Sequence, residues 1–256
     1  SKLTILIRLI CAKLSHTTPK LIVFASQAAL KLHVALGYKE SISICIPNGC
    51  RMPEKLSYNK DPTNLRRQMK IPDDAVVILS LARFHPVKDH NTLIKASNIV
   101  ISGLPKAHFL LVGKHMLAGR KSLESRITFN HRENFTFAGE QKDVQPFFEI
   151  ADLFCLHSAS EAFPNVLAEA MASGTLCIST DVGDASYILN SESQIVPPED
   201  PVALGNKILE VIDLPEWKKT ALRNSGSRRI REEFSVETMK FSFDKAYESL
   251  MDGHER

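Results

Sequence analysis

The middle of the chain alternates short apolar runs with stretches of helical character. The apolar runs cover residues 76–81, 108–112, 135–138, 153–157, 176–179 and 194–196. Helical patterns lie between them, at residues 89–101, 144–150 and 164–173. Continuous apolar strands that are separated by helices are typical of a parallel sheet covered on both faces. The pattern therefore predicts an α/β fold, a doubly wound parallel sheet, over about residues 50–215.

The two ends of the chain differ from this repeat. Residues 21–26, 27–36 and 43–46 have the pattern of a strand, a helix and a strand, and a turn and a polar stretch to Pro72 follow. A lone βαβ unit cannot bury its own faces, so residues 1–46 are predicted to be the tail end of a preceding domain. The central domain is assigned to residues 47–215. Residues 216–256 are predicted to be helices that wrap back toward the amino-terminal domain.

Composition narrows the class of protein. The 256 residues are 44% apolar and 24% charged, as in an ordinary globular protein, and the net charge of +3 is too small to indicate nucleic-acid binding. The five cysteines form no C-x-x-C pair, which indicates reduced thiols in a cytosolic compartment. No apolar run reaches the roughly 20 residues that a membrane-spanning helix needs. We therefore expect a cytoplasmic protein.

Residues 3–14 are apolar but interrupted by Arg8 and Lys13, and they allow two interpretations. One is a basic amphipathic helix that rests on an anionic membrane surface, which would place the protein at the inner face of the membrane. The other is a helix that packs against protein outside this chain, the more common role of a short amphipathic helix.

The first loop that carries candidate binding residues is residues 81–89, between a strand and a helix. Arg83 stands at the carboxyl end of the strand, Lys88 lies just before the helix, and Asp89 is a plausible N-cap. A diphosphate needs a forked donor, a point charge and free backbone N–H groups, and this loop offers all three. A pair of solvated surface charges is an equally good interpretation by position alone.

The second loop, residues 158–169, runs into the next helix. Pro164 suits the first helical position, and Asn165 and Val166 would then offer N–H groups to an anion. Glu169 stands among apolar helix residues, where a carboxylate needs a partner, and sugar or ribose hydroxyls are suitable donors to it. Glu161, eight positions earlier, is placed to reach a second sugar. Each glutamate taken alone is better interpreted as a surface carboxylate or a cap.

The third loop, residues 180–184, follows the next strand. Gly183 permits a positive φ angle or a close backbone approach, so this loop either lines the same cleft or forms a simple turn.

Together these motifs resemble family 4 glycosyltransferases of the GT-B fold. The resemblance rests on an ordered set: Pro47-Asn48-Gly49, Arg83 with Lys88, Leu111-Val112-Gly113 and Glu161-x7-Glu169. It extends from about residue 24 to residue 247. The stretch 151–183 is similar to members that build bacterial surface polysaccharides. The Rossmann-like carboxy-terminal domain of such a fold, with a βαβ remnant of the amino-terminal domain, is the architecture that the resemblance implies.

The resemblance also implies an activity. Arg83 and Lys88 would hold the diphosphate of a UDP-sugar or GDP-sugar, Glu161 the donor sugar and Glu169 the ribose. The amides of Phe163, Pro164, Asn165 and Val166 — three of them donors, because proline has no N–H — would surround sugar and phosphate. Such enzymes transfer a hexosyl or N-acetylhexosaminyl group with retention to a glycan or lipid-linked acceptor, with no cofactor and no metal. Arg83, Lys88 and Glu161 are the expected catalytic residues.

The sequence also departs from the family pattern. Ala162 stands where a glycine is common, and Gly183-Asp184 replaces a Gly-Gly pair. The Gly-rich acceptor loop and the amino-terminal Rossmann domain are not in these residues, so we expect a donor-binding half that is inactive alone. Two alternatives stay open: a non-catalytic nucleotide-binding module, and a sugar epimerase or phosphorylase on the same fold.

Overall fold

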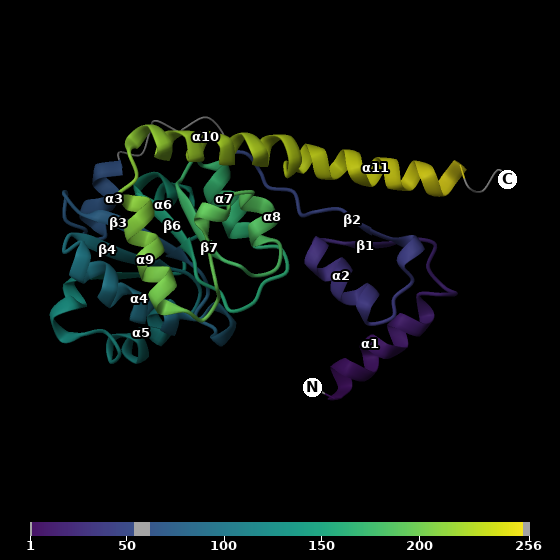
Figure 1. The fold of residues 1–256 in the computed structure, drawn as a ribbon, viewed down its shortest axis with the longest axis horizontal. Helices are drawn as coiled ribbons and strands as arrows, with labels where there is room; N and C mark the ends of the chain where they lie inside the picture. Colours follow the sequence, from purple (N-terminus) through teal and green to yellow (C-terminus); the bar gives the residue numbers. More distant parts are fainter. Residues whose placement is uncertain (1, 54–61, 253–256) are drawn as a thin grey trace.

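The structure is a computed structural model that describes residues 2–53 and 62–252 (Figure 1). In these ranges the α-helices are α1 (Lys2–Leu14), α2 (Gln27–Ala35), α3 (Pro62–Gln68), α4 (His90–Gly103), α5 (Met116–Glu124), α6 (Gln145–Ile150), α7 (Asn165–Ala172), α8 (Ala185–Leu189), α9 (Pro201–Ile212), α10 (Glu216–Glu233) and α11 (Val236–Asp252). The strands are β1 (Ile22–Phe24), β2 (Ser43–Cys45), β3 (Val76–Leu81), β4 (Ala107–Val112), β5 (Phe135–Gly139), β6 (Leu153–Leu156), β7 (Cys177–Thr180) and β8 (Ile195–Val196). Short 3-10 helices occupy Glu40–Ile42, Pro86–Lys88, Phe129–Asn134 and Glu192–Gln194.

Six strands form one parallel sheet in the order β5-β4-β3-β6-β7-β8. The chain starts in the middle at β3, runs outward to β5, and then returns to β6 on the other side of β3. This is the strand order of a doubly wound fold, and the direction of winding reverses between β3 and β6. The predicted α/β sheet is therefore confirmed.

Helices cover both faces of this sheet, as continuous apolar strands require. Val77 and Leu79 of β3 face the core cluster built with α6, α7, α8 and α10. Ile78, between them, faces the cluster built with α4, α5 and α9. All three side chains are fully buried. Each such side chain contributes roughly 1.5–3 kcal/mol on burial, so the middle of the sheet is a rigid support for the loops at its ends.

Four helices were not foreseen from the hydrophobic pattern: α3, α5, α8 and α9. Helix α3 lies in the stretch expected to be only polar, and residues 54–61 of that stretch lie outside the described part. Helix α5 contains Gly119, which weakens a helical pattern in sequence. In the structure a Cβ on Gly119 would meet the Phe84 ring at 2.4 Å, so the glycine permits close packing on the first loop.

The amino-terminal residues form a separate small unit. Strands β1 and β2 pair in parallel, with α2 connecting them, which confirms the predicted βαβ fragment. Figure 1 shows α1 and α2 beside this pair and α11 extending past it, away from the six-stranded domain. The chain crosses between the two regions at Cys50, whose N–H donates to the Phe234 carbonyl at 2.7 Å. The domain boundaries at residues 46 and 215 remain predictions.

None of the helices in the described residues combines the length and apolar character that crossing a bilayer requires.

Candidate functional site

The first and second loops leave the sheet at the point where its winding reverses. The first loop follows β3 and the second follows β6, and these two strands are neighbours. Ala159 N–H donates to the Val87 carbonyl at 2.9 Å and joins the loops. In open α/β sheets, ligands bind at the carboxyl ends of the strands at this reversal. The structure thus brings together two loops that are separated in sequence by three strands and their helices.

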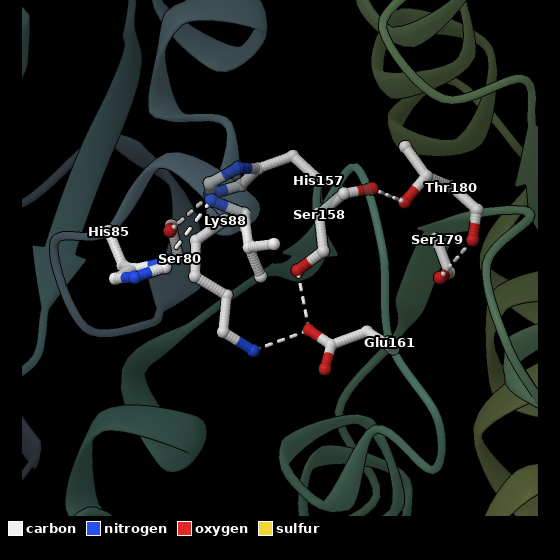
Figure 2. A network of polar contacts seen from close by, with 9 residues as sticks. Ser80, His85, Lys88, His157, Ser158, Glu161, Ser179 and Thr180 are labelled. Carbon is white, nitrogen blue, oxygen red and sulfur yellow. Dashed lines mark hydrogen bonds and ion pairs between the residues drawn. The ribbon is translucent and has the colours of Figure 1, made fainter. Parts of the chain in front are cut away.

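Lys88 and Glu161 form an ion pair between these loops (Figure 2). The Lys88 ammonium donates to Oε1 of Glu161, and the Ser158 hydroxyl donates to the same oxygen at 2.6 Å. The side chains are 17% and 13% exposed, so the pair is largely shielded from solvent. Among the described residues Oε2 of Glu161 has no partner. The pair fixes the carboxylate and leaves one oxygen free to accept a hydrogen bond.

The backbone of the first loop directs Lys88 toward β6. Residues Pro86–Lys88 form a 3-10 turn, and Asp89 follows with φ of +46°. The Asp89 side chain accepts from Thr92 N–H at 3.2 Å, so the predicted N-cap is confirmed. The carboxyl end of β4 braces the loop, because a Cβ on Gly113 would lie 2.1 Å from the Ala82 carbonyl oxygen. Only glycine permits this approach.

Arg83 lies apart from the Lys88 pair. It is exposed just after the end of β3, and within the described ranges its guanidinium has no hydrogen-bond or ion-pair partner. Its five N–H donors are available to an incoming anion. The predicted cations therefore differ: Lys88 is half-buried and paired, and Arg83 is exposed.

Helix α7 begins one residue later than the sequence predicts. Pro164 is the N-cap and not the first helical residue, with φ of −76° and ψ of 86°. The first turn closes on its carbonyl, which accepts from Leu167 N–H at 3.0 Å, and this places Pro164 just outside the helix. In the described part of the chain the amides of Asn165 and Val166 have no acceptor, as expected for a helix start. The Asn165 side chain accepts from Asn48 Nδ2 at 3.1 Å, which brings the 47–49 turn to this edge.

Phe163 and Glu169 have different surroundings. The Phe163 side chain is buried and its ring lies 5.8 Å from that of Phe234, so only its backbone can belong to a binding site. Glu169 reaches the surface of α7, and partial desolvation by the surrounding protein raises the pKa of its carboxyl. The carboxylate has no hydrogen-bond or ion-pair partner in residues 2–53 and 62–252, and because Glu169 is exposed it meets water there and is not buried among apolar residues as the sequence pattern predicts.

Behind the two loops is a buried polar cluster that sequence reasoning missed. Ser80 Oγ and His157 Nε2 lie 2.7 Å apart, and the ring of His90 lies 5.0 Å from that of His157. Burial lowers the pKa of His90 to about 3 and of His157 to about 4. Both imidazoles are therefore neutral near pH 7 and support the loops without adding charge. His157 directly follows the apolar strand β6, and an ionisable side chain at the end of such a run is the signal in the sequence that could have found it.

The third loop packs directly on the second. Gly183 has φ of +54°, and a Cβ there would lie 2.4 Å from the Ala162 carbonyl oxygen. Thr180 Oγ1 donates to the Ser158 carbonyl at 2.7 Å (Figure 2). The third loop therefore supports the second loop. In the part of the chain described, no three His, Cys, Asp or Glu side chains are grouped as metal ligands.

Comparison with known sequences finds matches to glycosyltransferases. A family model described as glycosyl transferases group 1 matches residues 75–213, more than half of the chain. The lipopolysaccharide core biosynthesis glycosyltransferase LpsE of Rhizobium meliloti (strain 1021) is 30% identical over 156 residues. That match covers 51% of this chain and 42% of the relative. The chain thus spans less than half the length of this curated relative.

Comparison with solved structures gives the same fold. The structure of Anabaena Alr3699/HepE in complex with UDP and glucose matches with a TM-score of 0.83 at 22% identity, over 94% of this chain and 66% of that one. Sucrose-phosphate synthase from Thermosynechococcus elongatus matches with a TM-score of 0.81 at 25% identity, over 99% of this chain and 63% of that one. Both likenesses include the amino-terminal unit as well as the six-stranded domain.

Proposed function

The chain belongs to the glycosyl transferases group 1 family and has the Rossmann-like domain of the GT-B fold, and we propose that it contains the donor-binding half of a retaining glycosyltransferase. The enzyme moves a sugar from a nucleoside-diphosphate sugar to a glycan or lipid-linked acceptor in bacterial polysaccharide synthesis. The similarity to LpsE supports this class of pathway. The observation that carries the proposal is the Lys88–Glu161 pair at the reversal point of the sheet.

The diphosphate is proposed to lie between the first loop and the start of α7. Lys88 has three N–H donors, and Glu161 uses one of them, so two remain for phosphate oxygens. Arg83 adds a forked donor from the exposed side, and the free amides of Asn165 and Val166 add the positive end of a helix. These groups would stabilise negative charge as the sugar–phosphate bond breaks and its electron pair moves to the leaving diphosphate.

The two glutamates are proposed to hold different parts of the donor. Oε2 of Glu161 is free and points away from Lys88 and Ser158, where a sugar hydroxyl can donate to it (Figure 2). Glu169 is the fifth residue of α7, and its unpaired carboxylate suits two ribose hydroxyls. UDP is the first nucleotide to test, because the similar Anabaena structure contains UDP and glucose.

Glutamine substitutions should separate these roles. Glu169→Gln keeps the shape but removes the charge that accepts the ribose hydroxyls, so we expect it to weaken free nucleotide and nucleotide sugar alike. Glu161→Gln should leave UDP or GDP binding nearly unchanged and weaken the nucleotide sugar alone, by about tenfold or more for a lost charged hydrogen bond. Isothermal titration calorimetry of both variants with both ligands measures this.

The control is Glu149→Gln, a carboxylate on α6 outside the three loops, which should change neither ligand's affinity. A reversed pattern, in which Glu161→Gln abolishes nucleotide binding and Glu169→Gln does not, would exchange the two roles. No effect from either substitution in a folded protein would show that the donor binds elsewhere.

The exposed helix α1 is proposed to pack against further protein of the acceptor half and not against lipid. Its exposed large apolar residues are Leu3, Ile5, Leu6, Ile7, Leu9, Ile10 and Leu14. At about 100° per residue, Lys13 falls inside this apolar arc, whereas a helix that lies on a membrane keeps its charges on the opposite face. We expect the chain not to co-sediment with anionic phospholipid vesicles. Co-sedimentation that Arg8→Glu with Lys13→Glu abolishes would instead place the protein at the inner face of the membrane.

A further inference from the structure

Asp184 of the third loop connects the amino-terminal unit to the six-stranded domain. Its side chain accepts two backbone hydrogen bonds from the start of α2: Gln27 N–H at 2.7 Å to Oδ2 and Ala28 N–H at 2.8 Å to Oδ1. These partners lie 157 and 156 residues away in sequence. Asp184 is 2% exposed, so the two bonds are shielded from water.

Asp184 bonds to helix α2 and not to the helix that it begins. Asp184 is the N-cap of α8, where an aspartate ordinarily accepts from its own helix, but its side chain makes no cap bond to α8. The carboxylate instead satisfies α2, whose third amide, that of Ala29, is taken by the N-cap Ser26 at 3.0 Å. A negative charge at the positive end of a helix is favourable. The first three amides of α2 are therefore all bonded.

The backbone of the same residue holds the second loop. Asp184 N–H donates to the Ala162 carbonyl at 2.9 Å, and the preceding Gly183 approaches the carbonyls of Glu161 and Ala162 too closely for a side chain. One residue therefore contacts α2 through its side chain and the residue next to Glu161 through its backbone. Hydrogen bonds and close contacts in the structure thus connect the start of α2 to the backbone around Glu161.

We propose that Asp184 is a positioning residue that couples the amino-terminal unit to Glu161. By holding α2 against the third loop, it sets the position of the Glu161 carboxylate relative to that unit. The importance of this coupling for the donor sugar rests on the proposed function, in which Glu161 contacts that sugar; the coupling itself does not.

Amide hydrogen exchange of the full chain tests the coupling from both sides. Asp184→Asn keeps the shape but leaves one acceptor oxygen, so we expect roughly tenfold faster exchange at residues 27–30 and also at residues 158–163. Gln27→Pro removes one donor from the opposite side and places its ring Cδ where Asp184 Oδ2 now accepts, so it also displaces the carboxylate. Proline is tolerated at the first helical position, and Ser26 before it already has the extended backbone that proline requires. It should loosen residues 158–163 as Asp184→Asn does, and the double variant should add little.

The matched control is Ser26→Ala, which removes a cap bond of α2 without touching Asp184. It should speed exchange in the first turn of α2 and leave residues 158–163 unchanged. If Asp184→Asn and Gln27→Pro also leave residues 158–163 unchanged, Asp184 only caps α2 and the proposal is overturned.

A second readout connects the coupling to the donor. For the UDP-sugar or GDP-sugar that the wild-type chain binds best, Asp184→Asn and Gln27→Pro should weaken the nucleotide sugar several-fold while free nucleotide affinity stays within about twofold. A simple loss of stability would not alter that ratio, and an unchanged ratio would overturn the positioning role. If the wild-type chain binds no nucleotide, the proposed function fails, and the exchange data still decide whether α2 and Glu161 are coupled.

Discussion

Replacing Lys88 by alanine is expected to weaken nucleoside diphosphate binding by about 10- to 150-fold and to leave nucleoside binding within about twofold. Lys88 is held at the reversal point of the sheet by Glu161 and retains two N–H donors for phosphate. A hydrogen bond to a charged group is worth about 1.5–3 kcal/mol, which gives this range. Titration calorimetry with UDP, GDP, uridine and guanosine measures the difference between ligands.

Two further variants make the Lys88 result specific. Arg83→Ala should also weaken nucleoside diphosphate binding more than nucleoside binding. It should change the stability of the fold little, because Arg83 is exposed and has no partner among the described residues. Lys95→Ala removes an exposed lysine of α4 and should change neither affinity. Equal losses of nucleoside and diphosphate affinity in Lys88→Ala would show that this lysine acts on the fold and not on phosphate.

The chain is expected to lose stability steeply as the pH falls from 6.5 toward about 4. Burial holds the pKa of His90 at about 3 and the pKa of both His108 and His157 at about 4, against an ordinary value of 6.5. In this window the unfolded chain binds protons that the folded chain excludes, so lowering the pH favours unfolding. Each histidine contributes up to about 1.4 kcal/mol per pH unit, and the three together roughly 4 kcal/mol per pH unit. Urea unfolding midpoints between pH 4 and 8 measure the slope.

Substitutions identify which histidines produce that slope. His157→Asn should reduce the pH dependence by about a third even if it lowers stability at every pH, because His90 and His108 still contribute. His115 is exposed and has a left-handed backbone that asparagine also adopts, so His115→Asn should leave the slope unchanged. A wild-type chain with a flat profile between pH 6.5 and 5 would mean that the buried histidines are hydrated or charged in the native state.

The fold follows from the sequence because the central strands of the six-stranded sheet, β3, β4, β6 and β7, are buried on both faces. Val77, Ile78 and Leu79 face alternate clusters, so all three must be apolar, and such a run is visible without any structure. The short helix α8 carries too few residues for a helical period and was not foreseen. The sequence pattern places Pro164 one residue too far into α7, because helix ends are set by capping contacts that the pattern does not contain.

The side-chain pairing at the site could not be predicted in the same way. Lys88 and Glu161 were each expected to meet the donor, but their ion pair spans 73 residues and depends on β3 and β6 being neighbours. Two bonds of Asp184 span more than 150 residues and depend on where the amino-terminal unit sits. Sequence patterns carry the local geometry of each loop, whereas these contacts arise only when the sheet has assembled.

The most direct test of the account is a crystal structure of this chain with UDP or GDP bound at saturating concentration. We expect the diphosphate within hydrogen-bond distance of Lys88 and Arg83, at the amides of Asn165 and Val166, with the ribose hydroxyls on Glu169. A nucleotide bound away from the first and second loops, or no bound nucleotide at millimolar concentration in crystals that leave this edge of the sheet open, would contradict it.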